Sequence, residues 1–307
     1  MTNYTKESSW KFPFLVPVSI IGIGLILEMM WATDLSTWYR PLNILLLIFS
    51  IFLVFSLRFA YPKSLITKFL ASPKTTVAAL LIFAIQMIVL GLVPQLPSYV
   101  DGMTFYERAF FKITHSLPFV MMLYYLLILL LMAILMRKPQ FSINYISFVV
   151  NHLVIYLLVV CGLFGAPDKK EYKVLLKENI PTNYCFDMKG QSRTLPFVFY
   201  LNSFSIDRYP GDKKEVRLYE AIVSIEHNKE VFSLCSLRVN HPYKIGDYYI
   251  YLENIKEAQA NMEGAVVLKV VKDPWYALAE IALWGMLIGA FFLFISKGAK
   301  TGRICDE

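Results

Sequence analysis

Residues 237–255, LRVNHPYKIGDYYIYLENI, and residues 266–294, VVLKVVKDPWYALAEIALWGMLIGAFFLF, decide the fold of this chain. The first segment alternates apolar and polar residues around Gly246-Asp247, a pair typical of turns, which predicts strands joined by a tight turn. The second segment contains an apolar run, residues 275–295, that matches the roughly 20 residues needed to span a bilayer. Only Asp273-Pro274 separates the strands from this run, and proline is common in the first turn of a helix. A β-rich domain therefore leads directly into a predicted membrane helix.

The composition of the whole chain favours a membrane protein. Of its 307 residues 57% are hydrophobic and only 17% are charged, and the mean hydropathy is +0.51. Such a chain is too apolar for a soluble globular protein. The net charge of +7 is then expected at the cytoplasmic rim of the helices, and no RNA-binding or zinc-finger pattern accompanies it. The sequence therefore predicts a multi-pass membrane protein without a nucleic-acid partner.

Six apolar runs are predicted to span the membrane. They are residues 13–32, 41–57, 75–94, 117–136, 145–165 and 275–295. The first run follows Lys6 and Lys11, as a signal peptide would, but it ends in ILEMMWATD without a small-residue cleavage pattern. We therefore interpret it as a retained helix.

The positive charges of the short loops predict the orientation of these helices. With the N-terminus inside, the inner segments hold eleven cations: Lys6, Lys11, Arg58, Lys63, Lys68, Lys74, Arg137, Lys138, Lys297, Lys300 and Arg303. The outer short loops hold three: Arg40, Arg108 and Lys112. Because cytoplasmic loops carry the excess of Lys and Arg, both termini are predicted to be cytoplasmic, in the inner membrane of the cell.

Residues 166–273 are then extracytoplasmic and long enough for one small domain. At least five strands are expected, at residues 195–210, 216–228, 231–240, 248–255 and 265–271, because aromatic and β-branched residues alternate there between turn signals. We expect an antiparallel sandwich or an open barrel. The predicted fold class is a polytopic α-helical membrane protein of about six transmembrane helices, with an extracytoplasmic all-β domain between helices five and six.

The histidine inside the fifth predicted helix is the first candidate for a functional site. His152 lies about two turns into that helix, towards its inner half, and an ionisable residue at such a depth is a functional hypothesis by default. A neutral imidazole is a good ligand for iron, including haem iron. The alternative is a hydrogen bond within the helices, for example with Tyr156 or Ser147. The residues alone leave both interpretations open.

Carboxylates and cysteines give weaker signals. Glu28 and Glu280 lie inside predicted helices near the outer interface, where snorkelling to water is the common explanation. The alternatives are pairing with Arg or Lys, or orienting a histidine ligand. The cysteines are Cys161, Cys185, Cys235 and Cys305, without a CxxC or CxxCH motif, so the chain is neither a thioredoxin-type protein nor itself a c-type cytochrome. Cys185 and Cys235 share the predicted oxidising compartment, and whether they pair is left open.

Several segments resemble the ResB-like (CcsB-type) proteins of cytochrome c biogenesis. VNHPYKIGDYYIY, at residues 239–251, is similar to the VNHPL…G…Y segment of that family, and residues 195–210 to its LPF…L…F…YP pattern. Residues 72–95, 112–127 and 151–165 resemble its first three helices. The chain departs from the family in having two more helices first, Leu252 where a glutamine is frequent, and Trp275 where glycine follows aspartate-proline. The resemblance implies four parts. The extra helices are residues 1–70 and the ResB-like membrane region is residues 71–165. The β domain is residues 166–273, and the last helix with a basic tail is residues 274–307.

The resemblance implies a membrane component of a System II cytochrome c synthase, which helps move haem across the membrane and attach it to apocytochrome c. The chain lacks the tryptophan-rich WWD segment, so a CcsA-type partner that carries it is implied, and at most the chain is a non-WWD subunit of a haem-attaching complex. The resemblance implies no catalytic residue in this chain. The alternative function is a non-catalytic membrane anchor or sensor whose outer domain binds a protein.

The resemblance also implies roles for individual residues, with a transient haem b as the group bound. His152 becomes the expected ligand of the haem iron, and His115 a second haem-binding candidate, against the alternative of a histidine solvated at the interface. Apart from the resemblance, Arg108 and Lys112 lie within two turns before His115, where they would meet haem propionates, since cations pair strongly with carboxylates. His241 belongs to the family motif and is expected to be structural, at a strand end or turn.

Overall fold

The computed structural model of the chain describes residues 10–30, 40–96, 103–140, 142–178, 180–209, 216–227, 230–256 and 264–301. The chain divides into two compact units. The helical unit comprises Met1–Asp168 and Trp275–Glu307, and the β unit comprises Lys169–Pro274. Each unit has its own hydrophobic core.

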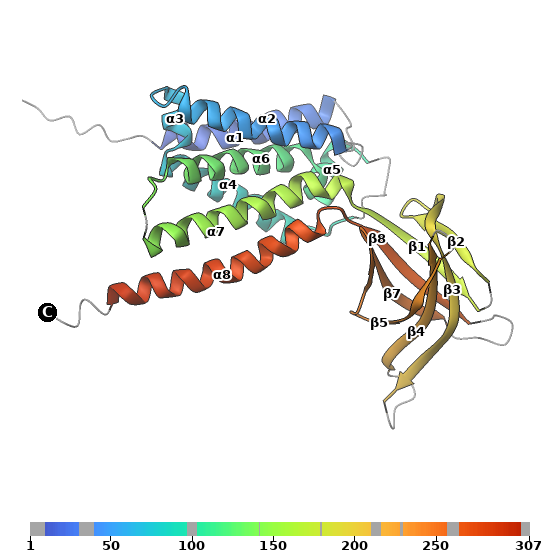
Figure 1. Cartoon of the computed structure of the whole chain (residues 1–307). Helices are drawn as coiled ribbons and strands as arrows, with labels where there is room; N and C mark the ends of the chain where they lie inside the picture. Colours follow the sequence, from blue (N-terminus) through green and yellow to red (C-terminus); the bar gives the residue numbers. More distant parts are fainter. Residues whose placement is uncertain are drawn as a thin grey trace, which may run out of the picture. The chain divides into compact units, whose positions relative to one another are not determined.

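Six helices of the described chain are long and apolar enough to cross a membrane (Figure 1). They are α1 (Lys11–Met30), α2 (Arg40–Phe59), α4 (Pro73–Leu92), α6 (Leu117–Met136), α7 (Ile143–Val160) and α8 (Tyr276–Thr301). The six expected helices are thereby confirmed, with the predicted bounds of α6 unchanged and the other ends displaced by a few residues. Two short helices, α3 (Leu65–Leu70) and α5 (Phe105–Phe111), were not predicted, because one or two turns are too short to show a hydrophobic period.

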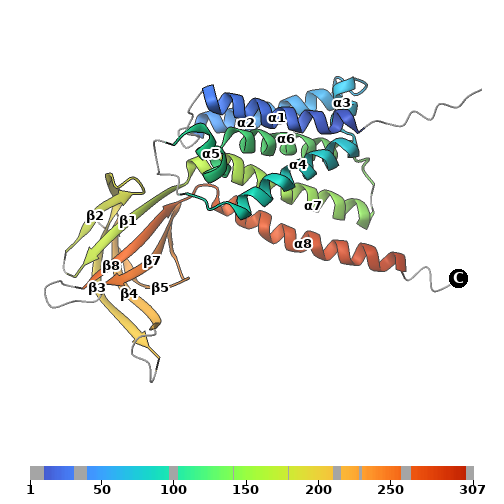
Figure 2. The ribbon, with the colours of Figure 1, turned by 180° about the vertical axis from the view of Figure 1, so that it is seen from behind.

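The chain reverses direction from each long helix to the next. The starts of α1, α4 and α7 therefore lie at one end of the unit, together with the ends of α2, α6 and α8 (Figures 1 and 2). At this end Arg58 Nε donates to the carbonyl of Leu135 across 3.2 Å and so joins α2 to α6. We call it the basic end, because the cations Lys11, Arg58, Lys68, Lys74, Arg137 and Lys138 lie there.

Helix α6 is the centre of the helical unit. One core cluster surrounds Met122 and Tyr125 and includes residues of α1 and α4. A second cluster surrounds Leu127 and also holds Tyr156 of α7 and residues of α2. Because α6 contributes buried side chains to both clusters, it is the helix against which the others are positioned.

Helix α8 packs closely on α7 through two glycines spaced four residues apart. A Cβ atom on Gly285 would lie 2.6 Å from Val154 Cγ1, and one on Gly289 would lie 2.7 Å from Asn151 Oδ1. Asn151 Nδ2 also donates to the carbonyl of Gly289 across 2.9 Å. Small residues at this spacing let two helix backbones approach each other, as in other membrane helix pairs.

The two chain connections to the β unit start from one place in the helical unit. Helix α7 continues as a π-helical turn, Cys161–Gly165, whose Phe164 carbonyl accepts from Asn43 Nδ2 at 3.2 Å. Trp275 Nε1 donates to Asp168 Oδ2 at 2.7 Å, and the Trp275 ring packs where a Cβ of Gly165 would be. The end of α7 and the start of α8 are therefore held together.

The β unit is one antiparallel sheet of eight strands in the order β5-β4-β3-β2-β1-β8-β7-β6. The strands are β1 (Lys170–Lys177), β2 (Thr182–Asp187), β3 (Ser192–Arg208), β4 (Val216–His227), β5 (Glu230–Arg238), β6 (Tyr243–Ile245), β7 (Tyr248–Lys256) and β8 (Ala265–Lys272). The antiparallel all-β prediction is confirmed. Strands β1 and β2 had not been predicted, and β6 is the strand that was expected before the turn at Gly246-Asp247.

The sheet curls around a single core, so it is one sheet rather than the two of a sandwich. Alternate residues of its strands share that core, for example Phe197 and Phe199 of β3 and Leu268 and Val270 of β8. Strands β4 and β5 pack against β7 across it. The predicted turn at Gly246-Asp247 joins β6 to β7, and Gly246 has a φ of 55°, which favours glycine.

Replacing Gly289 by Val should destabilise the helical unit. The new side chain would collide with Asn151, whose amide is already held by Ser147 and Gly289 carbonyls. Overpacking of this kind costs about 1–3 kcal/mol, which lowers the melting temperature by on the order of 5 °C. Thermal unfolding in detergent measures it. Gly91→Val in α4 is the matched control, because a Cβ there meets nothing within 4 Å, and an equal loss in both variants would contradict the close α7–α8 packing.

Candidate functional site

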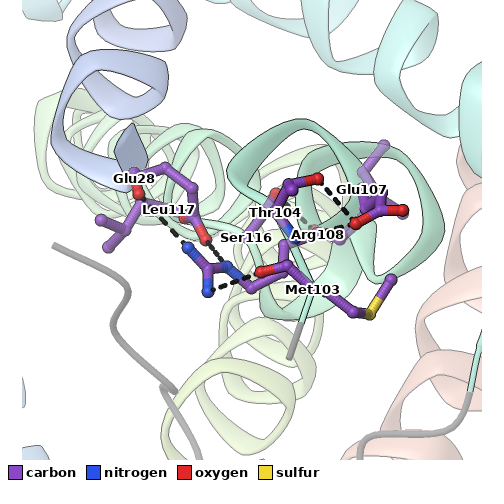
Figure 3. Close-up of polar contacts among 8 residues, drawn as sticks. Glu28, Met103, Thr104, Glu107, Arg108, Ser116 and Leu117 are labelled. Carbon is purple, nitrogen blue, oxygen red and sulfur yellow. Dashed lines mark hydrogen bonds and ion pairs between the residues drawn. The ribbon is translucent and has the colours of Figure 1, made fainter. Parts of the chain in front are cut away.

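A fully buried carboxylate joins three helices at the end of the helical unit opposite the basic end (Figure 3). The side chain of Glu28, near the end of α1, is 0% exposed. Its Oε1 accepts from Arg108 Nε of α5 at 3.0 Å, and its Oε2 accepts from the backbone N–H of Leu117, the first residue of α6, at 2.7 Å. Arg108 is also close to two carbonyls, those of Met103 and Glu28. Glu28 therefore binds a cation and a helix N-terminus together.

Glu28 takes the place of a side-chain cap on α6. The first N–H groups of a helix have no partner within it. Ser116 precedes α6, but its hydroxyl donates to the carbonyl of Ile113 and makes no cap. A carboxylate at this position also complements the positive end of the helix dipole. The interpretation of Glu28 as snorkelling to water is therefore wrong, and the alternative, pairing with an arginine, is confirmed.

The cations expected to bind propionates lie before α6 and not on it. Arg108 belongs to the separate helix α5, which begins with a capping box of Thr104 and Glu107. A 3₁₀ turn, Ile113–His115, separates α5 from α6. Lys112 is largely buried, with 9% of its surface exposed. The propionate role of Arg108 and Lys112 stays a prediction, but the structure shows that Arg108 already has a carboxylate partner.

His115 is exposed at the end of that 3₁₀ turn. Its Nδ1 lies 3.1 Å from the Thr114 hydroxyl. Haem binding by His115 stays a prediction.

His152 is held by its own helix. Its Nδ1 lies 2.8 Å from the carbonyl oxygen of Phe148, and the two rings stack with centroids 3.9 Å apart. A carbonyl can only accept, so in the neutral imidazole the proton is on Nδ1 and the lone pair on Nε2. Metal-binding histidines typically direct their other N–H to a carbonyl in this way. The ring is half-buried and presents a nitrogen suited to bind a metal.

The two partners suggested for His152 in the alternative interpretation do not bond to it. The hydroxyls of Ser147 and Tyr156 are both buried and have no hydrogen-bond partner within the described chain. Thr75, Gln86 and Tyr125 contribute the other such atoms. A buried polar atom without a partner is uncommon and calls for an explanation such as a bound ligand or water. The Tyr156 hydroxyl group lies one turn beyond His152 and was not among the predicted site residues.

A haem fits the chemistry of His152. The porphyrin supplies four of the iron ligands itself, so one histidine of the chain is sufficient for an axial position. No group of three His, Cys, Asp or Glu side chains able to hold a metal ion is present in the described ranges. The chemistry of His152 therefore fits one axial position of a haem, and haem binding itself stays a prediction.

The remaining histidines belong to the β unit. His241 is exposed and follows Asn240, whose φ is 65°. The backbone N–H of His241 donates to the carbonyl of Arg238 at 3.1 Å. It therefore lies in the turn after β5, where the sequence had placed it, while its structural role remains a prediction. His227 ends β4, and its ring is 3.0 Å from the carbonyl of Pro196.

Cys185 and Cys235 are free and buried in the β core. The Cys185 thiol donates to the carbonyl of Arg193, and the Cys235 thiol to that of Val223, so the two point to different strands. Burial raises the pKa of Cys235 to about 11. Burial, and then Asp187, also raises the pKa of Cys185. Both thiols are therefore protonated at neutral pH and act as core residues.

Comparison with known families gives one result. Residues 142–277 match the model of the ResB-like family, which confirms the resemblance over this part of the chain. The matched segment contains α7, the β unit and the start of α8, with His152 and His241 inside it. Glu28, Arg108, Lys112 and His115 lie outside it. The comparison with curated proteins gave no match.

Replacing Glu28 by Ala should destabilise the helical unit strongly. It leaves Arg108 without a counter-charge and the N-terminus of α6 without an acceptor, and breaking a buried ion pair costs about 3–5 kcal/mol. Glu28→Gln, which keeps an acceptor for Leu117, should lose less. The free energy of unfolding in mixed micelles is the quantity to measure.

Two further variants complete this test. Glu107→Ala, which removes only the capping box of α5, is the control and should cost about 1 kcal/mol. The double variant Glu28→Ala/Arg108→Ala should lose less than the sum of its single changes, because no unpaired charge remains. Strict additivity would show that the two side chains do not interact.

Proposed function

We propose, from the premise that residues 142–277 carry the ResB-like match, that the chain is a membrane component of a System II cytochrome c synthase. The family is associated with cytochrome c biogenesis. In this role the chain helps to move haem across the membrane and to attach it to apocytochrome c. The observation that carries the proposal is the position of His152: it lies in the matched segment, inside a predicted membrane span, with Nε2 left for a ligand.

His152 acts as one axial ligand of a haem b that the protein handles as cargo. Its Nδ1–H bond to Phe148 orients the ring, and the stacked Phe148 side chain limits its rotation. The second axial ligand of the haem iron is expected from the partner protein or from the protein that receives the haem next. The bound haem supplies the vinyl groups that form thioethers with the thiols of apocytochrome c.

The partner is a CcsA-type membrane protein that carries the WWD segment. The five tryptophans of this chain are isolated in the sequence, and we therefore assign the WWD segment to this partner. In this arrangement the present chain contributes the ligand on α7 and an extracytoplasmic β unit that binds the apocytochrome or supports the partner.

The proposed location is the cytoplasmic membrane, with both chain termini in the cytoplasm. Eleven of the fourteen Lys and Arg residues in the terminal segments and short loops then lie inside. Helix α7 runs outward, and His152 lies before the midpoint of the apolar span Ile143–Asp168. That position suits a ligand that receives haem on the inner side of the membrane.

Alkaline phosphatase fused after Asp168 should be active, and the same enzyme fused after Arg137 should be inactive. This enzyme folds only where its disulfides form, outside the cytoplasm. Its activity in intact cells, normalised to the amount of fusion protein, measures the orientation. Activity at Arg137 with none at Asp168 would reverse the proposed topology.

Replacing His152 by Ala should lower haem content and c-type cytochrome assembly together. The variant loses the axial nitrogen but no partner that another helix needs, because the Nδ1 bond stays within α7. Haem is measured by absorption of the protein purified with its partner, and cytochromes by haem staining. Exogenous imidazole, which can fill the vacated axial position, should restore part of both signals.

His227→Ala is the matched control for this experiment. His227 lies at the end of β4 in the β unit, and its Nδ1 is 3.0 Å from the carbonyl oxygen of Pro196. The control should keep full haem content and full assembly. If His152→Ala also keeps both, the ligand assignment is wrong and His152 is a packing residue.

A further inference from the structure

Three side chains form a column at the basic end of α6 and α7. The guanidinium carbon of Arg137 lies 5.0 Å from the centroid of the Phe148 ring. Phe148 in turn stacks on His152 at 3.9 Å, with an angle of 28° between the rings. Because these spacings are short, the guanidinium lies no more than about 9 Å from the His152 ring. The exposed guanidinium of Arg137 and the imidazole ring of His152 are therefore close together.

Arg137 differs from Arg108 in how its charge is used. Arg108 is paired with the buried carboxylate of Glu28. Arg137 is exposed, and no carboxylate of the described residues lies within ion-pair distance of it. Its contact with an aromatic face is weak in water, whereas a bond to a carboxylate is strong and can use two N–H groups. An incoming carboxylate can therefore replace the ring as its partner.

The position of Arg137 also favours it over the cations before α6. Helix α6 has 20 residues and is about 30 Å long. Arg108 and Lys112 precede its first residue, whereas Arg137 follows its last. Arg137 is therefore at the same end as Phe148 and on the inner side of His152.

We propose that Arg137 binds a carboxylate of the planar iron macrocycle whose metal His152 ligates, with Phe148 keeping the two side chains close to each other before the macrocycle binds. The inference rests on the proposed function. It adds a residue that the family resemblance did not indicate, and it defines the cargo as an anionic porphyrin. The guanidinium and the His152 ring are at most about 9 Å apart, and the propionates of a porphyrin extend outward from the ring whose iron His152 binds. Arg137 is a specificity residue for the propionates, and His152 is the ligand of the metal.

The test compares ferric haem with its dimethyl ester, which keeps the iron and the ring but has no carboxylates. The purified full chain in detergent is titrated with each compound, and binding is followed by the absorption change of axial ligation. We expect the wild-type chain to bind haem more tightly than the ester. Arg137→Ala should weaken haem binding about tenfold, the size of one charge-assisted hydrogen bond, and leave the ester unchanged. Arg137→Lys, which keeps the charge, should restore part of the loss.

Two control variants make the result specific. Lys74→Ala removes a cation that also lies over an aromatic ring at the basic end, 5.2 Å from the centroid of Trp10, and should bind both compounds as the wild type does. His152→Ala should lose the spectrum of axial ligation with both compounds.

The outcomes separate this inference from the proposed function. If the wild type binds haem and ester equally, or if Arg137→Ala weakens both equally, Arg137 does not bind a carboxylate, while loss of ligation in His152→Ala would still support the haem role. If the wild-type chain binds neither compound, the proposed function and this inference are both wrong.

Discussion

The helical unit depends on a carboxylate that has no access to water. An unpaired charge in such surroundings is strongly unfavourable, so Glu28 requires both a cation and hydrogen-bond donors. Arg108 and the N–H of Leu117 supply them, and the three groups come from α1, α5 and α6. This constraint fixes the start of α6, and α6 carries the two cores against which α4, α2 and α7 pack. The position of His152 on α7 follows from the position of α6.

The long elements could be predicted because each carries its own signal. An apolar run of about 20 residues identifies a membrane helix, and alternation over many residues identifies a strand. The short helices could not, because α3 has 6 residues and α5 has 7. Strand β1 was not predicted, although its alternate residues Tyr172, Val174 and Leu176 belong to the core. The apolar Leu175 between the last two obscures the alternation in the sequence.

The sequence was sufficient to identify His152 as a candidate residue, but not to predict which groups it contacts. The depth of His152 in an apolar run marked it as a candidate, yet nothing in the sequence separates a bond to Phe148 within the helix from one to a neighbouring hydroxyl. The partner of Glu28 lies 80 residues away, and the cation over Phe148 is the residue that follows the preceding helix. Such pairings depend on which faces of the helices meet, and a single sequence without its packing does not contain that information.

The bond between Trp275 and Asp168 makes the β unit an insertion within a helical hairpin. Lys170, the first residue of β1, pairs with Lys272, the last of β8, so the inserted domain begins and ends at one point. The order of synthesis follows from this arrangement. Helix α7 leaves the ribosome first, and roughly a hundred residues, or about 5–20 seconds of translation, pass before α8 appears. During that interval Val154 and Asn151 lack their contacts with Gly285 and Gly289 of α8. Helix α8 therefore completes the packing on α7 only after the β unit has been synthesised.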